Sequence, residues 1–194
     1  MTPGVAASIL WVTWFVTWIG AGVWSAKTRT QLKTDRFGPH RWAVGLGALL
    51  LFCPALPPPA TLLTTQLWRA PLTITWSLFA LVVASFGFCW WARLHLGRLW
   101  SGFVTLKQDH RVVDSGPYGL VRHPIYSGVM AAALSTAMIR ATPAGLAGFV
   151  LITVGFRATA AIEEGFLRAQ LGAEAYDAYS RSVGRLLPGL GRLR

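Results

Sequence analysis

Arg122, His123 and Pro124 form a short polar run directly before a long apolar stretch. Proline lacks an N–H and favours the first position of a helix, so we expect a helix to begin at Pro124. Its N-terminus offers unpaired N–H groups and a positive dipole end, and Arg122 adds a bidentate donor; both suit a carboxylate or phosphate. The alternative is that Arg122 is only an interfacial cation and that Tyr126 belongs to an aromatic belt.

A second polar pair, Glu163 and Glu164, stands at the end of another apolar stretch. Burying a carboxylate in lipid costs at least about 2.5 kcal/mol, so both should be in water, paired or facing a polar cavity. Adjacent helical residues point about 100° apart, so one of them can face the helix bundle while the other faces outward. Arg168, four residues after Glu164, is its simplest partner. Glu163 is therefore the stronger candidate for chemistry.

The composition indicates the setting in which these residues work. Of 194 residues, 54% are hydrophobic and 13% charged, whereas soluble domains carry about a quarter charged residues. The chain is therefore predicted to be an integral membrane protein. The net charge of +11 favours cytoplasmic loops facing anionic lipid over a nucleic-acid partner. Cys53 and Cys89 lie in apolar runs, and His95 and His110 are expected in loops, so no metal site is predicted.

Five apolar stretches are candidate membrane spans. They cover residues 5–24, 42–63, 72–92, 125–139 and 142–161. Prolines interrupt the second, so its far end is expected to turn at the interface. The last two are separated by two residues and should form an antiparallel hairpin. Gly128, Ala132 and Thr136 in one helix, and Ala144 and Gly148 in the other, have the spacing of close helix packing, although alanine-rich helices also produce it by chance.

The charged residues predict the orientation of these spans. Sixteen of the 18 lysines and arginines, all except Arg69 and Arg140, fall on one side of a five-span chain, and that side should be cytoplasmic. All seven acidic residues share it (Asp35, Asp109, Asp114, Glu163, Glu164, Glu174 and Asp177). We thus predict an all-α membrane protein with the N-terminus outside and a cytoplasmic C-terminal helix. Residues 1–92 would hold three helices and a basic loop, and residues 93–194 the hairpin 125–161 and the functional region.

The last hundred residues resemble the isoprenylcysteine carboxyl methyltransferase (ICMT) family. The resemblance rests on three motifs in order: Gly116-Pro117-Tyr118-x-x-Val121-Arg122-His123-Pro124-Ile125-Tyr126-x-Gly128, Glu163-Glu164-x-x-Leu167, and Leu171-Gly172-x-x-x-Tyr176-x-x-Tyr179 followed by Val183-x-Arg185-x-x-Pro188. The pair Trp100-Ser101 also fits. Residues 1–90 match only as hydrophobic spans.

The resemblance implies a methyltransferase that uses S-adenosylmethionine in a cytoplasmic pocket and methylates a lipophilic acceptor entering from the bilayer. It implies catalytic roles for Arg122, Glu163 and His123, and acceptor binding by Trp100 and Ser101. The cofactor-binding residues that it implies are Gly116, Pro117, Tyr118, Val121, Arg122, His123, Pro124, Tyr126, Glu163 and Glu164. A composition rich in Ala, Gly, Arg and Trp is compatible with a high-GC bacterium, hence the inner membrane.

Other functions stay open at this point. The wider superfamily includes phospholipid N-methyltransferases and small-thiol S-methyltransferases, so the acceptor is not fixed. A sterol-type reductase using NADPH would share the fold but usually has more spans. A non-enzymatic scaffold whose basic loops bind anionic lipid would explain the charge, but it gives no reason for the Arg-His-Pro and Glu-Glu runs to occur together.

Overall fold

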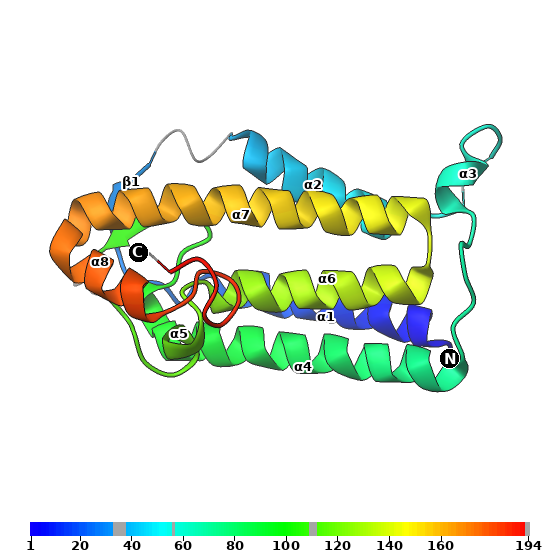
Figure 1. The fold of residues 1–194 in the computed structure, drawn as a ribbon, viewed down its shortest axis with the longest axis horizontal. Coiled ribbons are helices and arrows are strands. Elements are labelled where there is room, and N and C mark those ends of the chain that lie inside the picture. Colours follow the sequence, from blue (N-terminus) through cyan, green and yellow to red (C-terminus); the bar gives the residue numbers. More distant parts are fainter. Residues whose placement is uncertain (33–37, 56, 109–111, 193–194) are drawn as a thin grey trace.

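A computed structural model describes residues 1–32, 38–55, 57–108 and 112–192 and shows a mostly helical bundle (Figure 1). The elements are α1 (Pro3–Ala21), β1 (Thr28–Gln31), α2 (Pro39–Leu51), α3 (Thr61–Thr64), α4 (Leu72–Leu96), a 3-10 turn (Gly97–Leu99), β2 (Thr105–Lys107), α5 (Pro117–Leu120), α6 (Pro124–Arg140), α7 (Pro143–Leu171) and α8 (Ala173–Ser182). Several charged loop residues of the topology argument (Lys33, Asp35, Arg36, Asp109, Arg111 and Arg194), and His110, lie outside the described residues.

Each expected span contains a helix, but the helices differ in length. Among the described residues, three helical stretches are long and apolar enough to cross a membrane: Pro3–Ala21, Leu72–Leu99 and Pro143–Leu171. Helix α6 has 17 residues and α2 has 13. The predicted interruption of the second span, 42–63, is confirmed: α2 stops at Leu51, because Pro54 and the prolines at 57–59 cannot continue a helix.

Prolines at the first helical position explain where the bundle helices begin. Pro3, Pro39, Pro124 and Pro143 each open a helix. The Thr142 side chain also accepts a hydrogen bond from the Gly145 N–H and caps α7. Between α6 and α7, Ala141 adopts a left-handed conformation with φ of 53°, so the hairpin turns within two residues, as expected.

Two glycines of the hairpin pack closely against helices outside it. A Cβ on Gly128 would lie 2.5 Å from Cys89 Sγ in α4, and a Cβ on Gly148 would lie 2.5 Å from the Gly47 carbonyl oxygen in α2. These two glycines let α6 approach α4 and let α7 approach α2. The four-residue spacing therefore has a packing role at Gly128 and Gly148.

Gly148→Val is therefore expected to destabilise the bundle by about 1–3 kcal/mol, the usual range for overpacking. The added side chain would collide with backbone atoms of Gly47 and Leu51, which cannot swing aside. The measurement is the thermal unfolding midpoint in detergent. Gly45→Val is the matched control, since a Cβ there meets nothing within 4 Å. An equal change in both variants would contradict this packing role.

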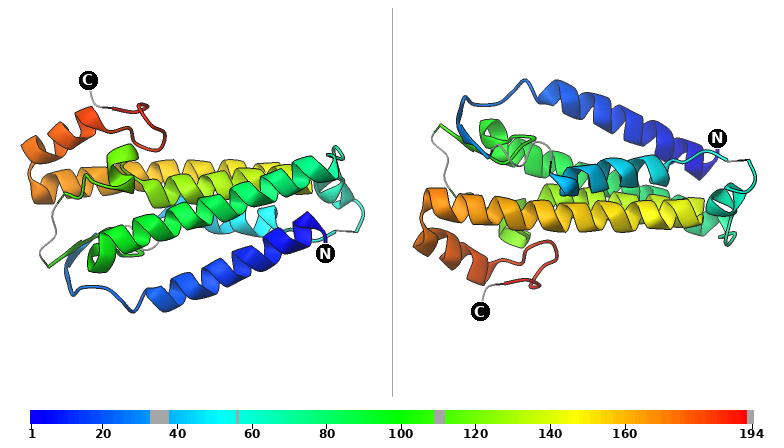
Figure 2. Two further views of the ribbon diagram at one scale, coloured as in Figure 1. Left: turned by 90° about the horizontal axis from the view of Figure 1, so that it is seen from below. Right: turned by 90° about the horizontal axis from the view of Figure 1, so that it is seen from above.

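Smaller elements gather at one end of the bundle, as Figures 1 and 2 show. We call this group the end cap: β1, β2, α5, α8 and residues 183–192. The antiparallel pairing of Thr28 with Lys107 and of Gln31 with Thr105 was not predicted, because strands of four and three residues leave no readable alternation. Helix α8 lies where the sequence predicted a C-terminal helix. The end cap encloses the polar ends of α4, α6 and α7.

Candidate functional site

Glu164 lies at the centre of a buried ion-pair network. Its Oε1 accepts a hydrogen bond from Arg122 Nε at 2.8 Å and lies 3.1 Å from His123 Nε2, and its Oε2 lies 2.6 Å from Arg185 Nη2. The expected partner Arg168 instead pairs with Asp177 of α8, at 2.7 Å. The simple pairing predicted for Glu164 is therefore wrong: the inward-facing carboxylate of the pair recruits cations from two other segments.

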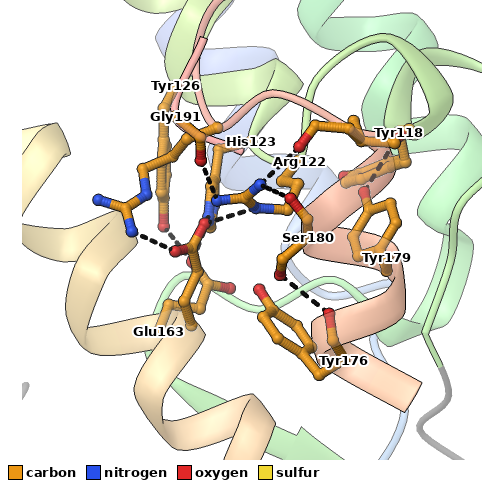
Figure 3. Close-up of polar contacts among 12 residues, drawn as sticks. Tyr118, Arg122, His123, Tyr126, Glu163, Tyr176, Tyr179, Ser180 and Gly191 are labelled. Carbon is orange, nitrogen blue, oxygen red and sulfur yellow. Dashed lines mark hydrogen bonds and ion pairs between the residues drawn. The ribbon is translucent and has the colours of Figure 1, made fainter. Parts of the chain in front are cut away.

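Arg122 joins three parts of the chain. Beyond Glu164, its guanidinium donates to the carbonyl oxygens of Ser180, Val183 and Gly191 (Figure 3). Its backbone N–H donates to the Gly184 carbonyl at 2.8 Å. The side chain is 1% exposed. Arg122 thus fixes the C-terminal segment onto the start of α6, and most of its donors are already occupied by the protein.

Glu163 faces a different set of groups. The Tyr126 hydroxyl donates to Glu163 Oε2 at 2.9 Å, and His123 Nδ1 lies 3.6 Å from the same oxygen. The His123 and Tyr126 rings stack at 5.3 Å, and Tyr126 stacks on Phe156 at 4.8 Å. His123 therefore lies between the two carboxylates, and Glu163, with its side chain 30% exposed, is the less enclosed of the two.

A cavity of about 260 Å³ opens beside this cluster. Arg122, His123, Tyr126 and Glu163 form part of its polar wall, and Tyr176 and Tyr179 of α8 line it from the end cap. Its other end is apolar: the lining residues farthest along their helices from the end cap are Trp14 of α1, Val129 of α6 and Phe156 of α7. The cavity thus joins a charged end to an apolar end between the long helices.

The structure brings most of the residues predicted for the site to this cavity. Those that line it are Trp100, Ser101, Tyr118, Arg122, His123, Pro124, Tyr126 and Glu163. Glu164 is not among the residues that line the cavity, but it binds Arg122 and His123, which do. Gly116, Pro117 and Val121 are not among the lining residues described, although Pro117 opens α5, which carries Tyr118. Arg122 and Glu163 thus share one cavity.

Some residues that shape the site were missed from sequence. Arg185 belongs to a quoted motif, but its bond to Glu164 depends on a fold-back of the C-terminal segment. Arg93 is fully buried and donates to the carbonyl oxygens of Ala21, Trp24 and Gly97. Its guanidinium carbon lies 4.5 Å from the Trp100 ring centroid, which holds Trp100 at the wall. His95, expected in a loop, lies in the last turn of α4, 3.0 Å from Ser115 Oγ.

Three tyrosines of the cavity, Tyr118, Tyr176 and Tyr179, stay protonated near neutral pH. Burial raises the pKa of Tyr118, and the negative charge of Glu163 raises it further. Burial likewise raises the pKa of Tyr176 and Tyr179. The Tyr179 hydroxyl can therefore donate at 2.8 Å to the Tyr118 carbonyl, which ties α8 to α5 (Figure 3). These rings serve as hydrogen-bond donors and apolar surface rather than as bases.

The donor set of the cavity fits a cationic, partly aromatic cofactor such as S-adenosylmethionine. Glu163 offers a carboxylate at the wall, and both Arg122 and Arg185 are engaged with Glu164 instead. Thr105 lines the same cavity, and its buried Oγ1 has no hydrogen-bond partner among the described residues. Buried polar atoms are nearly always satisfied, so a bound group is expected nearby. No cluster of three or more potential metal ligands occurs in the described part of the chain.

Comparison with known proteins matches this region to one family. The model of the isoprenylcysteine carboxyl methyltransferase (ICMT) family matches residues 77–166. Two proteins named probable protein-S-isoprenylcysteine O-methyltransferase, from Oryza sativa subsp. indica and subsp. japonica, are 33% identical over 86 residues, which is 44% of this chain and 44% of each of them. The cobalt-zinc-cadmium resistance protein CzcN of Cupriavidus metallidurans is 26% identical over 113 residues, 58% of this chain and 38% of that protein.

The matched stretch contains the core of the candidate site. Residues 77–166 run from α4 to α7 and include Arg122, His123, Tyr126, Glu163 and Glu164. The chain spans less than half the length of each of these curated relatives. Residues 1–76, with α1 and α2, and the end of the chain after 166 lie outside the family match. Over the region that carries the cavity's charged wall, the chain is similar to the ICMT family.

Proposed function

We propose that this chain is an integral membrane methyltransferase that uses S-adenosylmethionine to methylate a lipophilic acceptor, an isoprenylcysteine-like carboxylate or a related prenyl or acyl molecule. One observation carries the proposal: a single cavity joins the Glu163 carboxylate to an apolar end lined by Trp14, Val129 and Phe156. A polar cofactor and an apolar acceptor could meet there. The ICMT-like stretch, which includes the charged wall, supports the same reading.

The proposal includes a topology. Five helices, α1, α2, α4, α6 and α7, would span or enter the inner membrane of a bacterium, with α2 and α6 the shortest. The N-terminus would lie outside and the end cap in the cytoplasm, because the basic residues cluster at that end. Residues 1–92 would form a supporting half, and residues 93–194 the half that binds cofactor. The partners would be the bilayer and the lipophilic acceptor, with no nucleic acid.

The chain's own residues would act mainly by alignment. S-adenosylmethionine, when bound, supplies a methyl group on a positively charged sulfur, which keeps the bonding electron pair as the methyl leaves. Glu163, oriented by the Tyr126 hydroxyl, would hold positive charge at the wall, with Tyr118 and the segment 116–126 around the cofactor. Trp100 and Ser101 would contact the acceptor. Holding reactants in line can contribute about 7–11 kcal/mol to the barrier reduction.

The need for a base depends on the acceptor. A carboxylate acceptor is already an anion near pH 7 and needs none. A thiol or amine, the acceptors of the alternative S- and N-methyltransferase functions, must lose a proton, and Glu163 or His123 is then the candidate base. Arg122, with its donors engaged by Glu164 and three carbonyls, would hold this geometry rather than react.

Binding and transfer can be tested separately. Isothermal titration calorimetry in detergent should give heat with S-adenosylmethionine and S-adenosylhomocysteine but not with NADPH. Incubation of the protein with methyl-labelled S-adenosylmethionine and bacterial lipid extract, followed by mass spectrometry, should give a labelled apolar product. Heat with NADPH alone would favour a reductase, and no heat with any of the three would favour a scaffold.

A further inference from the structure

Packed aromatic rings of α1 and α4 border the apolar end of the cavity. Trp14 lines the cavity and is 9% exposed. Its ring stacks on Phe86 of α4 at 4.7 Å with an interplanar angle of 10°, and on Trp18 at 4.8 Å. An edge of Trp11 also packs against it, at 6.0 Å. Trp14 is thus enclosed by three rings and has little freedom to move aside.

The surrounding contacts keep these rings in place. The Trp11 indole N–H donates to Thr136 Oγ1 of α6 at 3.0 Å, which ties α1 to the hairpin. Trp14 also belongs to a buried cluster with Val82, Cys89 and Val129. Closely packed interiors respond to volume changes of a single methylene. The apolar end is therefore a rigid boundary rather than a flexible opening.

The space before this boundary is small. Phe156 and Glu163 line the two ends and are seven residues apart on α7, so about 10 Å separates them along the helix axis. The cavity volume of about 260 Å³ is below the ~300–1,000 Å³ typical of clefts that bury drug-sized ligands. The same cavity would have to hold both cofactor and acceptor. The room left for an apolar chain is therefore short.

From this geometry we infer that Trp14 sets the length of the apolar group that the site accepts, and that this group is short, of dimethylallyl rather than farnesyl size. The inference rests on the proposed function for the reaction that the acceptor undergoes. The position of Trp14 at the apolar end of the cavity does not depend on that function. Trp14 comes from α1, outside residues 77–166, so this boundary is not part of the stretch that matches the ICMT family.

The test measures how apolar length affects binding. N-acetylcysteine carrying an S-dimethylallyl, S-geranyl or S-farnesyl group is titrated into the protein in lipid nanodiscs, with and without saturating S-adenosylhomocysteine, and heat from empty nanodiscs is subtracted. Wild type should bind the dimethylallyl compound at least tenfold more tightly than the farnesyl compound. Trp14→Ala should change the ratio of these affinities by at least tenfold toward farnesyl, and Trp14→Phe should change it in the same direction by less.

Trp90→Ala is the matched control. Trp90 packs on the same aromatic cluster but is not among the residues lining the cavity, so its ratio should stay at the wild-type value. The inference is overturned if wild type prefers farnesyl, if Trp90→Ala changes the ratio as much as Trp14→Ala, if both folded Trp14 variants keep the wild-type ratio, or if no compound binds. Failure of the proposed function would appear separately, as absent S-adenosylhomocysteine binding, while titrations without it still measure the boundary. If Trp14→Ala does not fold, the ratio of dimethylallyl to farnesyl affinity in Trp14→Phe tests the inference.

Discussion

Glu164→Ala is expected to lower the free energy of unfolding by about 3–5 kcal/mol, the largest stability loss of any single carboxylate change among the described residues. Removing one partner of a buried ion pair leaves the other charge unpaired. Here Arg122, 1% exposed, would lose its only carboxylate partner among the described residues, and Arg185 and His123 would lose the same partner. The measurement is thermal or chaotrope unfolding of the detergent-solubilised protein, followed by circular dichroism.

A local readout distinguishes this role from a general loss of stability. Because Arg122 also holds the carbonyls of Val183 and Gly191, hydrogen exchange of residues 183–192 should rise before the long helices open. Glu174→Ala is the matched control: Glu174 lies in the first turn of α8 and is exposed. The prediction is contradicted if Glu164→Ala unfolds at the same midpoint as Glu174→Ala and if residues 183–192 keep their slow hydrogen exchange. The ion-pair network of Glu164 would then not stabilise the fold.

Much of the helical framework could be predicted from sequence because its signals are local. Proline has no N–H to lose at a first helical position, so Pro124 and Pro143 mark helix starts without any knowledge of the partners. Pro54 is a local signal for a helix end, since it prevents α2 from continuing. The helix partners were not predictable, because Gly128 and Gly148 are suited to close approach by any neighbour, and only the fold brings them to α4 and α2.

The roles of the two glutamates show the same limit within the site. Both were predicted to be paired or to face a polar cavity, and the structure places one in each setting. The partner of Glu164 was not predictable, because Arg168, the nearest cation in sequence, has Asp177 within reach once α8 folds back. Arg122, the true partner of Glu164, is 42 residues away in sequence. Trp14 was likewise one of many apolar residues of α1, and only packing brings it to the cavity.

Glu163→Gln is expected to weaken S-adenosylmethionine binding by about 10- to 150-fold with little change in unfolding midpoint. A hydrogen bond to a charged group contributes about 1.5–3 kcal/mol, and each 1.4 kcal/mol is a factor of ten in affinity. Glutamine keeps the shape and can still accept from the Tyr126 hydroxyl, so the cavity should persist without its negative charge. Isothermal titration calorimetry with the purified variant gives the affinity.

Comparing two ligands shows which cation Glu163 would hold. S-adenosylhomocysteine has the same amino group but no charge on sulfur. If Glu163 faces the sulfur, Glu163→Gln should weaken S-adenosylmethionine binding more than S-adenosylhomocysteine binding; if it faces the amino group, both should weaken equally. Glu174→Gln makes the same change from carboxylate to carboxamide at an exposed position, so it should leave both affinities unaltered. Wild-type affinity for both ligands in a folded Glu163→Gln protein would exclude Glu163 from cofactor binding, because the carboxylate at the cavity wall would then contribute no charge interaction to the ligand.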